Sequence, residues 1–430
     1  MNIAFICQPW DEAVAPVRAG SIPIVTYQLA RRLAPAAAVT VFAKRGAEQP
    51  AVDRDEHGIC YRRFCVARAE QTLRPLRLAD RMLAQVGHAE PLFGTALFYR
   101  DFGQRVARQL AETQPPSTPT VVHIHNFSQF VPVVRAAMPR AKIVLHMHCE
   151  WLTQLKPRTV ARRLAETDLV LGVSDYLTDK IRARFPAQAL KCHTLVNGVD
   201  VPAFRPAHDA ADTVPAADGP RLLFVGRVSP EKGVHTLLAA FGQVAARYPT
   251  ARLDIVGPLG ETPYEYIVRV ADDPHVAELA AFYDGRLRHR AGSYQRRLDA
   301  AIRPELADRV HFHGAVSHGD VARFYRAATL LVNPSLSEAF GMSVIEAMAG
   351  GLPVVTTRVG GMTEVVADGE VGRLVPPNDA DALAATLVDL LADRDAHTAM
   401  RAAGPAHAAR YDWDAVTATL AGHYARLLDT

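Results

Sequence analysis

Several features are scarce in this 430-residue sequence, and each shortage excludes a class of protein. Cysteine occurs only five times, at scattered positions, so a disulfide-stapled scaffold is excluded and a reduced, cytoplasmic compartment is expected. No run of eighteen consecutive apolar residues occurs, which argues against a transmembrane helix but leaves peripheral contact with a membrane surface open. The formal net charge of +3 gives no electrostatic argument for binding nucleic acid.

Two motifs of nucleotide-binding proteins are also missing. Neither G-x-G-x-x-G nor G-x-x-x-x-G-K-[ST] occurs, which argues against a dinucleotide-dependent oxidoreductase and against a P-loop NTPase. The first residues, MNIAFICQPW, lack a basic segment, so they indicate a buried strand rather than a signal peptide. With 49% hydrophobic and 22% charged residues the composition is that of an ordinary globular protein, and the length predicts two or three domains.

Apolar runs alternate with helical patterns along the chain, which predicts an α/β fold with parallel sheets. In the first half a helix is predicted at 22–33, with strands at 2–7, 39–43, 120–125, 142–146, 169–173 and 193–196. The second half has predicted strands at 221–226, 252–257, 310–313, 329–333 and 353–357. Its predicted helices lie at 234–246, 321–327, 380–391, 397–409 and 414–428.

These patterns predict two Rossmann-like domains that face each other across a cleft, where ligands of such folds bind. The expected divisions are an N-terminal, acceptor-side domain at 1–196, a proline-rich linker at 197–220 and a C-terminal domain at 221–410. A C-terminal helix at 411–430 is expected to pack back on the N-terminal domain. The arginine-rich insert 258–308 is interpreted either as a solvated helical insert or as a surface that contacts an acceptor or partner.

The segment NPSLSEAFGMSVIEAMAGGLPVV, residues 333–355, carries the densest candidate chemistry. It predicts a strand end, a loop with Glu338, and a helix that opens near Gly341 and carries Glu346. Glu346, among apolar neighbours, is suited to accept hydrogen bonds from a hydroxylated ligand. The helix start favours an anion through the free N–H groups of Gly341, Met342 and Ser343. An ordinary strand, loop and helix with a surface glutamate is the alternative.

Two glycine-containing loops are further candidates. Arg227 and Lys232 follow a predicted strand, and two cations on such a loop can clamp a diphosphate, although a solvated basic loop also fits. In the first half, Gly20 lets the main chain approach a ligand closely, and Ser21 is expected to cap the following helix. A plain turn with a helix cap explains that second loop equally well.

Histidines cluster at two predicted strand ends, as His123 and His125 in VVHIHN and as His146 and His148 in VLHMHCE. Alternate spacing places each pair on one face of its strand. His125 and His148 are expected nearer the cleft as ligand contacts, and the other two are expected to be packed; a core role for all four is the alternative. The spacing matches no recognisable zinc motif, so no metal site is expected.

With these residues identified, the chain resembles the retaining glycosyltransferases of GT-B fold known as family 4, or glycosyl transferases group 1. The resemblance covers nearly the whole length and is strongest across 223–376. The Glu-x7-Glu pattern of that family is met by Glu338 and Glu346. The other motifs that carry the resemblance are FVGRVSPEKGVHTLLAAF, VHFHGAVSHGDV, SEAFGMSVIEAMAGGLPVV and VGGMTEVV.

The resemblance implies a role for each matching position. Arg227 and Lys232 would bind the donor diphosphate, and Glu346 would hold the ribose hydroxyls. The remaining donor-binding positions are Gly20, against the donor phosphate, and the helix start formed by Phe340, Gly341, Met342 and Ser343. His148, near the reacting carbon, and Glu338, facing the transferred sugar, are the candidate catalytic residues. Many members have two adjacent glycines where this chain has Ala19 and Gly20.

The implied activity is transfer of a sugar from a nucleotide donor, with UDP suggested by family habit, to an acceptor hydroxyl with retained configuration. Cations and helix-end amides can stabilise the charge that grows on the departing nucleoside diphosphate, so neither a metal nor a cofactor is expected. The acceptor could be a saccharide, a lipid-linked sugar or a small molecule. A non-catalytic nucleotide-sugar-binding subunit and a phosphorylase of the same fold are the alternatives.

Overall fold

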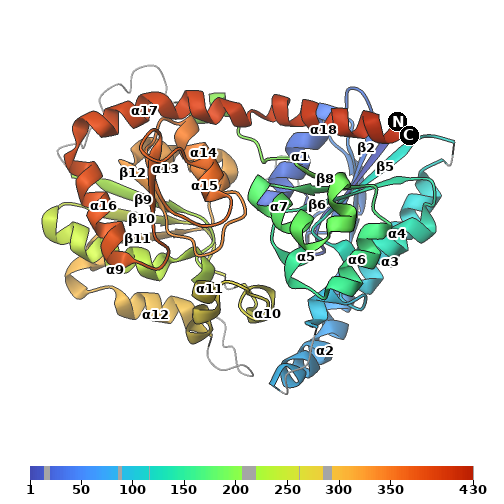
Figure 1. Cartoon of the computed structure of the whole chain (residues 1–430), viewed down its shortest axis with the longest axis horizontal. Coiled ribbons are helices and arrows are strands. Elements are labelled where there is room, and N and C mark those ends of the chain that lie inside the picture. Colours follow the sequence, from blue (N-terminus) through green and yellow to red (C-terminus); the bar gives the residue numbers. More distant parts are fainter. Residues whose placement is uncertain are drawn as a thin grey trace. The chain divides into compact units, whose positions relative to one another are not determined.

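The computed structural model describes residues 1–13, 20–85, 90–115, 117–205, 219–260, 262–283 and 293–429. The chain divides into two compact units, an N-terminal unit of Met1–Asn197 with Trp413–Thr430 and a C-terminal unit of Gly198–Asp412 (Figure 1). Each unit contains a sheet that is parallel or mostly parallel, together with helices, so the predicted α/β class is confirmed. Most of the predicted linker 197–220 lies outside the described residues.

The sheet of the N-terminal unit has, within the described residues, eight strands in the order β3-β4-β2-β1-β5-β6-β7-β8. All neighbours pair in parallel except β3 and β4, which are antiparallel. The strands are β1 (Asn2–Ile6), β2 (Ala38–Lys44), β3 (Val52–Arg54), β4 (Cys60–Phe64), β5 (Thr120–His125), β6 (Lys142–Met147), β7 (Leu169–Gly172) and β8 (Cys192–Thr194). β5 and β6 lie side by side in mid-sheet, so the two histidine-bearing strands are neighbours.

The sequence did not predict β3 or β4. In β4, CYRRF, two arginines interrupt the apolar pattern that marks a strand. The Arg63 side chain is nevertheless buried, because its Nε donates to the Ala13 carbonyl at 3.0 Å and its Nη1 to Asp53 at 2.7 Å. A tertiary ion pair therefore permits a charge inside this strand.

Helices of the N-terminal unit include α1, whose start differs from the prediction. Ser21 does not cap α1: the cap residue is Gly20 at φ 90°, no side chain bonds the helix start, and Ser21 is already helical. The C-terminal helix α18 packs against α1 within this unit (Figure 1). The helices are α1 (Ser21–Leu33), α2 (Ala67–Gln85), α3 (Arg100–Thr113), α4 (Val131–Ala137), α5 (Trp151–Gln154), α6 (Pro157–Ala165), α7 (Asp175–Arg184) and α18 (Trp413–Leu428).

The sheet of the C-terminal unit is parallel throughout, with the order β11-β10-β9-β12-β13-β14 among the described residues. Its strands are β9 (Arg221–Val225), β10 (Arg252–Val256), β11 (Val310–Gly314), β12 (Leu330–Asn333), β13 (Val354–Thr357) and β14 (Gly372–Val375). Its helices are α8 (Val201–Phe204), α9 (Val234–Arg247), α10 (Tyr264–Ile267), α11 (Pro274–Glu278), α12 (Ser293–Ala301), α13 (His318–Ala327), α14 (Met342–Ala349), α15 (Met362–Val365), α16 (Ala380–Ala392) and α17 (Arg394–Ala408). Because β9 and β12 are neighbours, the loops that follow them emerge at one edge of the sheet.

The insert predicted at 258–308 is not simply solvated where the structure describes it. A small apolar cluster joins its residues Val268, Val276, Leu279 and Tyr283 to Leu336, which lies in the loop after β12. The insert therefore braces the loop that carries Glu338. Arg286, Arg288 and Arg290 lie outside the described residues. Among the described helices, none combines the length and the apolar character that crossing a membrane requires.

Candidate active site

The loops after β9 and β12 touch directly, and a glycine permits it. Gly233 has φ 69°, and a Cβ there would lie 2.0 Å from the Pro334 carbonyl oxygen, so a side chain at this position would force the loops apart. The Leu336 N–H donates to the Glu231 carbonyl at 2.8 Å, which adds a main-chain bond. This contact brings two predicted site residues together: the Lys232 Nζ lies 2.7 Å from Glu338 Oε2.

The Lys232–Glu338 pair is accessible rather than buried in the core. Its side chains are 24% and 17% exposed, so a ligand can reach either charge. In this state each charge neutralises the other, and a ligand phosphate would compete with Glu338 for the ammonium group. The pair is therefore suited to exchange partners when an anion arrives.

Arg227 lies at the start of the same loop and is exposed. Its Nη1 donates to the Thr262 hydroxyl at 2.9 Å, and that hydroxyl donates to Glu231 Oε1 at 2.7 Å. Ser229 donates to the same oxygen at 2.7 Å. Glu231 is buried, and the hydrogen bonds that it accepts fix the conformation of this loop. The sequence reasoning assigned no role to Glu231, although it directly precedes Lys232.

The start of α14 offers main-chain donors. Gly341 is its cap residue, with φ 97°, and a Cβ there would lie 2.7 Å from the Met362 sulfur, so the site requires glycine. No side chain caps the helix, and the N–H groups of Met342 and Ser343 precede the first intrahelical bonds. The Phe340 ring is buried edge-on to Tyr411, so this residue can offer a ligand only its main chain.

Glu346 is only 5% exposed and is held by two partners on α13. His318 Nε2 lies 2.8 Å from Oε1, and the Tyr325 hydroxyl donates to Oε2 at 2.8 Å. Burial and the charge of Glu346 raise the pKa of Tyr325 well above its ordinary value. Burial alone would lower the pKa of His318, but the hydrogen bond and charge of Glu346, with Asp200 nearby, outweigh it and raise that pKa.

The sequence reasoning missed His318 and Tyr325. The sequence contained one indication that they act together: their spacing of seven residues places both on one face of a helix. Each oxygen of Glu346 accepts one bond from these partners and keeps lone-pair capacity for a further donor. A carboxylate held in this way is suited to accept bonds from two neighbouring hydroxyl groups.

The four histidines form a cluster in the N-terminal unit. His125 and His146 are register partners in β5 and β6; His123, His125 and His146 are fully buried, and His148 is half-buried. His125 is therefore not the accessible ligand contact that the spacing predicted, because it packs inside the unit. Burial lowers the pKa of His146 to about 3, and burial with the neighbouring imidazoles lowers the pKa of the other three well below 6.5.

One ligand atom each from His123, His125 and His146 lies within 4.8 Å of the others. Zinc–nitrogen bonds of about 2.0–2.1 Å in tetrahedral geometry place ligand nitrogens only about 3.3 Å apart. Several of these nitrogens are instead engaged in hydrogen bonds: His123 Nδ1 with the Tyr424 hydroxyl at 2.7 Å, His123 Nε2 with His146 Nδ1 at 3.1 Å, and His125 Nδ1 with His148 Nε2 at 2.9 Å. The absence of a metal site stays a prediction.

The predicted site residues are divided between the two units. Gly20 and His148 belong to the N-terminal unit, whereas Arg227, Lys232, Glu338, Glu346 and the start of α14 belong to the C-terminal unit. Ala19 lies outside the described residues. The convergence of both sets on one ligand is therefore an expectation.

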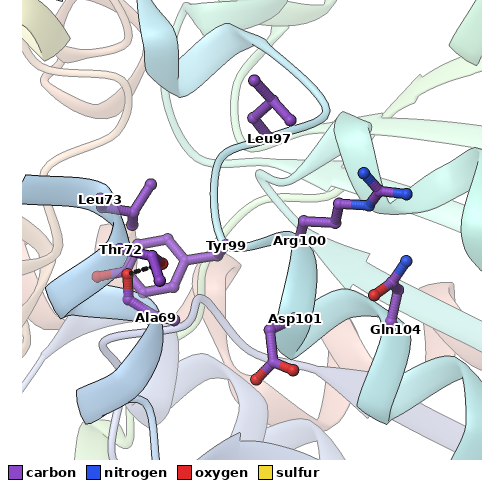
Figure 2. Close-up of a pocket in the computed structure, with 8 residues that line it drawn as sticks. All are labelled: Ala69, Thr72, Leu73, Leu97, Tyr99, Arg100, Asp101 and Gln104. Atoms are coloured by element: carbon purple, nitrogen blue, oxygen red, sulfur yellow. Dashed lines mark hydrogen bonds between the residues drawn. The ribbon is translucent and has the colours of Figure 1, made fainter. Parts of the chain in front are cut away.

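A pocket on the N-terminal unit lies between α2 and the start of α3 (Figure 2). Tyr99, one of the lining residues, has the left-handed φ of 54°, and the Thr72 hydroxyl donates to the Ala69 carbonyl at 2.8 Å (Figure 2). Three of its lining residues, Ala69, Thr72 and Leu73, lie on α2. Its lining residues are Ala69, Thr72, Leu73, Leu97, Tyr99, Arg100, Asp101 and Gln104.

Comparison with known families finds two matches. The family described as Glycosyltransferase Family 4 matches residues 22–202, and the family described as Glycosyl transferases group 1 matches residues 208–407. Together the two matches span most of the chain.

Individual relatives show the same similarity. A D-inositol 3-phosphate glycosyltransferase of Catenulispora acidiphila is 33% identical over 292 residues, which cover 64% of this chain and 61% of the relative. A lipopolysaccharide 1,2-N-acetylglucosaminetransferase of Salmonella typhimurium is 27% identical and covers 94% of this chain and 93% of the relative. The structure of a sucrose-phosphate synthase from Thermosynechococcus elongatus shares the fold, with a TM-score of 0.74, 24% identity and coverage of 100% and 99%.

The chain spans about three fifths of the length of the Catenulispora relative that it matches. The two family matches follow the division of the chain into two α/β units, and the Glu-x7-Glu stretch with its lysine loop lies inside the second match. The chain therefore belongs to the GT-B glycosyltransferases of family 4.

Proposed function

We propose that this protein transfers a hexose-like sugar from a nucleoside diphosphate donor to a hydroxyl group of an acceptor. One observation carries the proposal: the C-terminal unit presents an exchangeable Lys232–Glu338 pair, the open start of α14 and the braced carboxylate of Glu346. These groups match a diphosphate, its transferred sugar and a ribose. Family membership supports the same activity.

In this proposal the diphosphate displaces Glu338 from Lys232. The ammonium group, the Arg227 guanidinium and the N–H groups of Met342 and Ser343 then face the phosphate oxygens. Negative charge grows on those oxygens as the glycosidic bond breaks, so these groups stabilise the transition state more than the ground state. Glu338, released from the lysine, faces the hydroxyl groups of the sugar.

Glu346 accepts hydrogen bonds from the ribose, one hydroxyl to each oxygen. The bonds from His318 and Tyr325 hold the carboxylate in one orientation, so little side-chain freedom remains to be lost on binding. From the N-terminal unit, the family resemblance assigns Gly20 to the donor phosphate and His148 to the transferred sugar.

The finer assignments rest on the family resemblance. UDP as the nucleotide, retained configuration, independence of metal and a cytoplasmic location belong to this part of the proposal. The names of the relatives, an inositol phosphate glycosyltransferase and a lipopolysaccharide N-acetylglucosaminetransferase, support a hydroxyl-rich acceptor such as a cyclitol phosphate or a saccharide.

The direct test incubates the full chain with a panel of UDP- and GDP-sugars and with either inositol 3-phosphate or a core oligosaccharide. We expect acceptor-dependent release of nucleoside diphosphate together with a glycosylated product, and its loss in Glu338→Gln. Release of sugar 1-phosphate only when inorganic phosphate is added would instead indicate a phosphorylase. Tight binding of a nucleotide sugar, with no turnover on any acceptor, would indicate a non-catalytic subunit.

A further inference from the structure

A chain of hydrogen bonds leads from α1 to His148. The Thr26 hydroxyl on α1 lies 3.1 Å from His125 Nε2, and His125 Nδ1 lies 2.9 Å from His148 Nε2. We call Thr26, His125 and His148 the relay. Thr26 is buried and His125 is fully buried, so water cannot replace a member of the relay without displacing protein atoms.

The direction of every proton in the relay follows from its first member. The Thr26 oxygen lies 2.8 Å from the Ile22 carbonyl, which can only accept, so the single hydroxyl proton lies on that bond. Thr26 must then accept from His125, which places the proton of His125 on Nε2. A neutral His125 therefore has a bare Nδ1, which accepts from a proton on His148 Nε2.

The imidazoles are neutral, which the assignment requires. Burial and the neighbouring histidines lower the pKa of both His125 and His148 well below 6.5. A neutral imidazole carries one proton. Because the proton of His148 is on Nε2, its Nδ1 is a lone-pair acceptor.

This Nδ1 is buried and has no hydrogen-bond partner among the described residues. A buried acceptor without a donor is unfavourable, so a ligand hydroxyl or a water molecule that donates to Nδ1 is stabilised there. A bare imidazole nitrogen needs a donor, which a sugar hydroxyl supplies and a phosphate oxygen does not.

Hydrogen bonds fix the main chain of His148 as well as its ring. The Asn126 side chain accepts from the His148 N–H at 2.7 Å and donates to Gln8 at 3.0 Å. Asn126 itself has φ 59°, a left-handed conformation that is uncommon outside glycine. The loop after β5 therefore holds a sparsely populated backbone conformation at the point where it fixes His148.

We propose that Thr26 and His125 are positioning residues that hold His148 as its Nε2–H tautomer, so that Nδ1 accepts a hydrogen bond from a hydroxyl of the transferred sugar. The inference rests on the proposed function for the identity of the ligand. The relay itself is a property of the unliganded N-terminal unit.

Nitrogen NMR of the ¹⁵N-histidine-labelled full chain tests the relay without a substrate. We expect His148, assigned by the signals lost in His148→Gln, to show a protonated Nε2 and a bare Nδ1 at pH 7.5. In Thr26→Val the acceptor for His125 is removed, so His125 can move its proton to Nδ1 and His148 must then carry its own on Nδ1. Thr26→Ser keeps the hydroxyl and is expected to restore the wild-type pattern.

Thr167→Val is the matched control. Thr167 is likewise buried, and its hydroxyl likewise donates to a carbonyl four residues earlier, that of Arg163 at 2.9 Å, but it is not part of the relay. We expect kcat to fall about fivefold to tenfold in Thr26→Val, the effect of losing one ordinary hydrogen bond in the transition state, and less in the control. The dissociation constant of UDP, measured by calorimetry, should not change.

A wild-type His148 that carries its proton on Nδ1 would overturn the proposal, and this measurement needs no variant to fold. An unchanged His148 tautomer in a folded Thr26→Val protein would also overturn it. Failure of the proposed function has a different signature, since a wild-type protein that neither binds UDP nor transfers a sugar can still show the relay in its spectrum.

Discussion

Replacing Glu346 by glutamine tests the ribose assignment, because the amide keeps the shape of the carboxylate and removes its charge. Two bonds to the protein, from His318 and Tyr325, and two proposed bonds to the ribose would change from charge-assisted to neutral. Hydrogen bonds to charged groups contribute about 1.5–3 kcal/mol and neutral ones about 0.5–1.5 kcal/mol, so each bond loses about 1 kcal/mol.

The two ribose bonds therefore set the loss of affinity at about 2 kcal/mol, which is about thirtyfold in the dissociation constant of UDP. The two protein bonds set a separate loss of stability of similar size, about 2 kcal/mol in the free energy of unfolding. Calorimetric titration with UDP measures the first quantity, and urea denaturation measures the second. Glu370→Gln, at an exposed glutamate of the same unit, is the control and should change neither.

A second ligand makes the assay specific for the ribose. UDP that lacks the 2′ and 3′ hydroxyls should bind wild type more weakly than UDP does, and Glu346→Gln should discriminate between the two ligands about thirtyfold less than wild type does. If both proteins discriminate between the ligands to the same degree, Glu346 does not hold the ribose. The reasoning is also refuted if the variant binds UDP as tightly as wild type.

Three further predictions follow from the same contacts. Lys232→Ala should weaken UDP binding at least tenfold by calorimetry, whereas Lys232→Arg should recover part of it; an unchanged constant would remove the lysine from the diphosphate site. The pKa of His318 is raised in the folded protein, so its pair with Glu346 stabilises the fold fully below about pH 6.5. This stabilisation is lost as the pH rises through the raised pKa of His318. The difference in unfolding free energy between wild type and His318→Gln, measured by urea titration, should therefore shrink from pH 6 to pH 9. A difference that grows over this range would contradict the assignment. Dialysis against a chelator should leave the rate of sugar transfer unchanged, and a loss that Mg²⁺ restores would overturn the proposed metal independence.

Elements with a strong periodic pattern could be predicted from the sequence. The strand at Thr120–His125 and the helix from Val234 were expected within a few residues of their observed bounds, because long apolar periodicity reports burial directly. β14, four residues long, and β4, with its two arginines, were missed because their pairing depends on neighbouring strands rather than on their own pattern.

The candidate site divides in the same way. Local motifs indicated Lys232, Glu338 and Glu346, since a strand-to-helix loop places such residues at the sheet edge by itself. The partners that hold Glu346 come from α13, and no local pattern relates that helix to the stretch 333–355. The alternate spacing of the histidines along the strand predicted that His125 lies near the cleft. In the structure, the packing of α1 buries His125 against Thr26.

The sequence by itself determined the class of fold, the family and the identity of the charged residues, because periodicity and motif spacing are properties of neighbouring positions along the chain. Only the tertiary structure decided the partners of those residues: Glu338 on Lys232, His318 and Tyr325 on Glu346, and Thr26 on His125. Hydrogen bonds act over about 3 Å, and the pairs Thr26–His125 and Lys232–Glu338, which are 99 and 106 positions apart in the sequence, come within that range only when the sheets and helices pack.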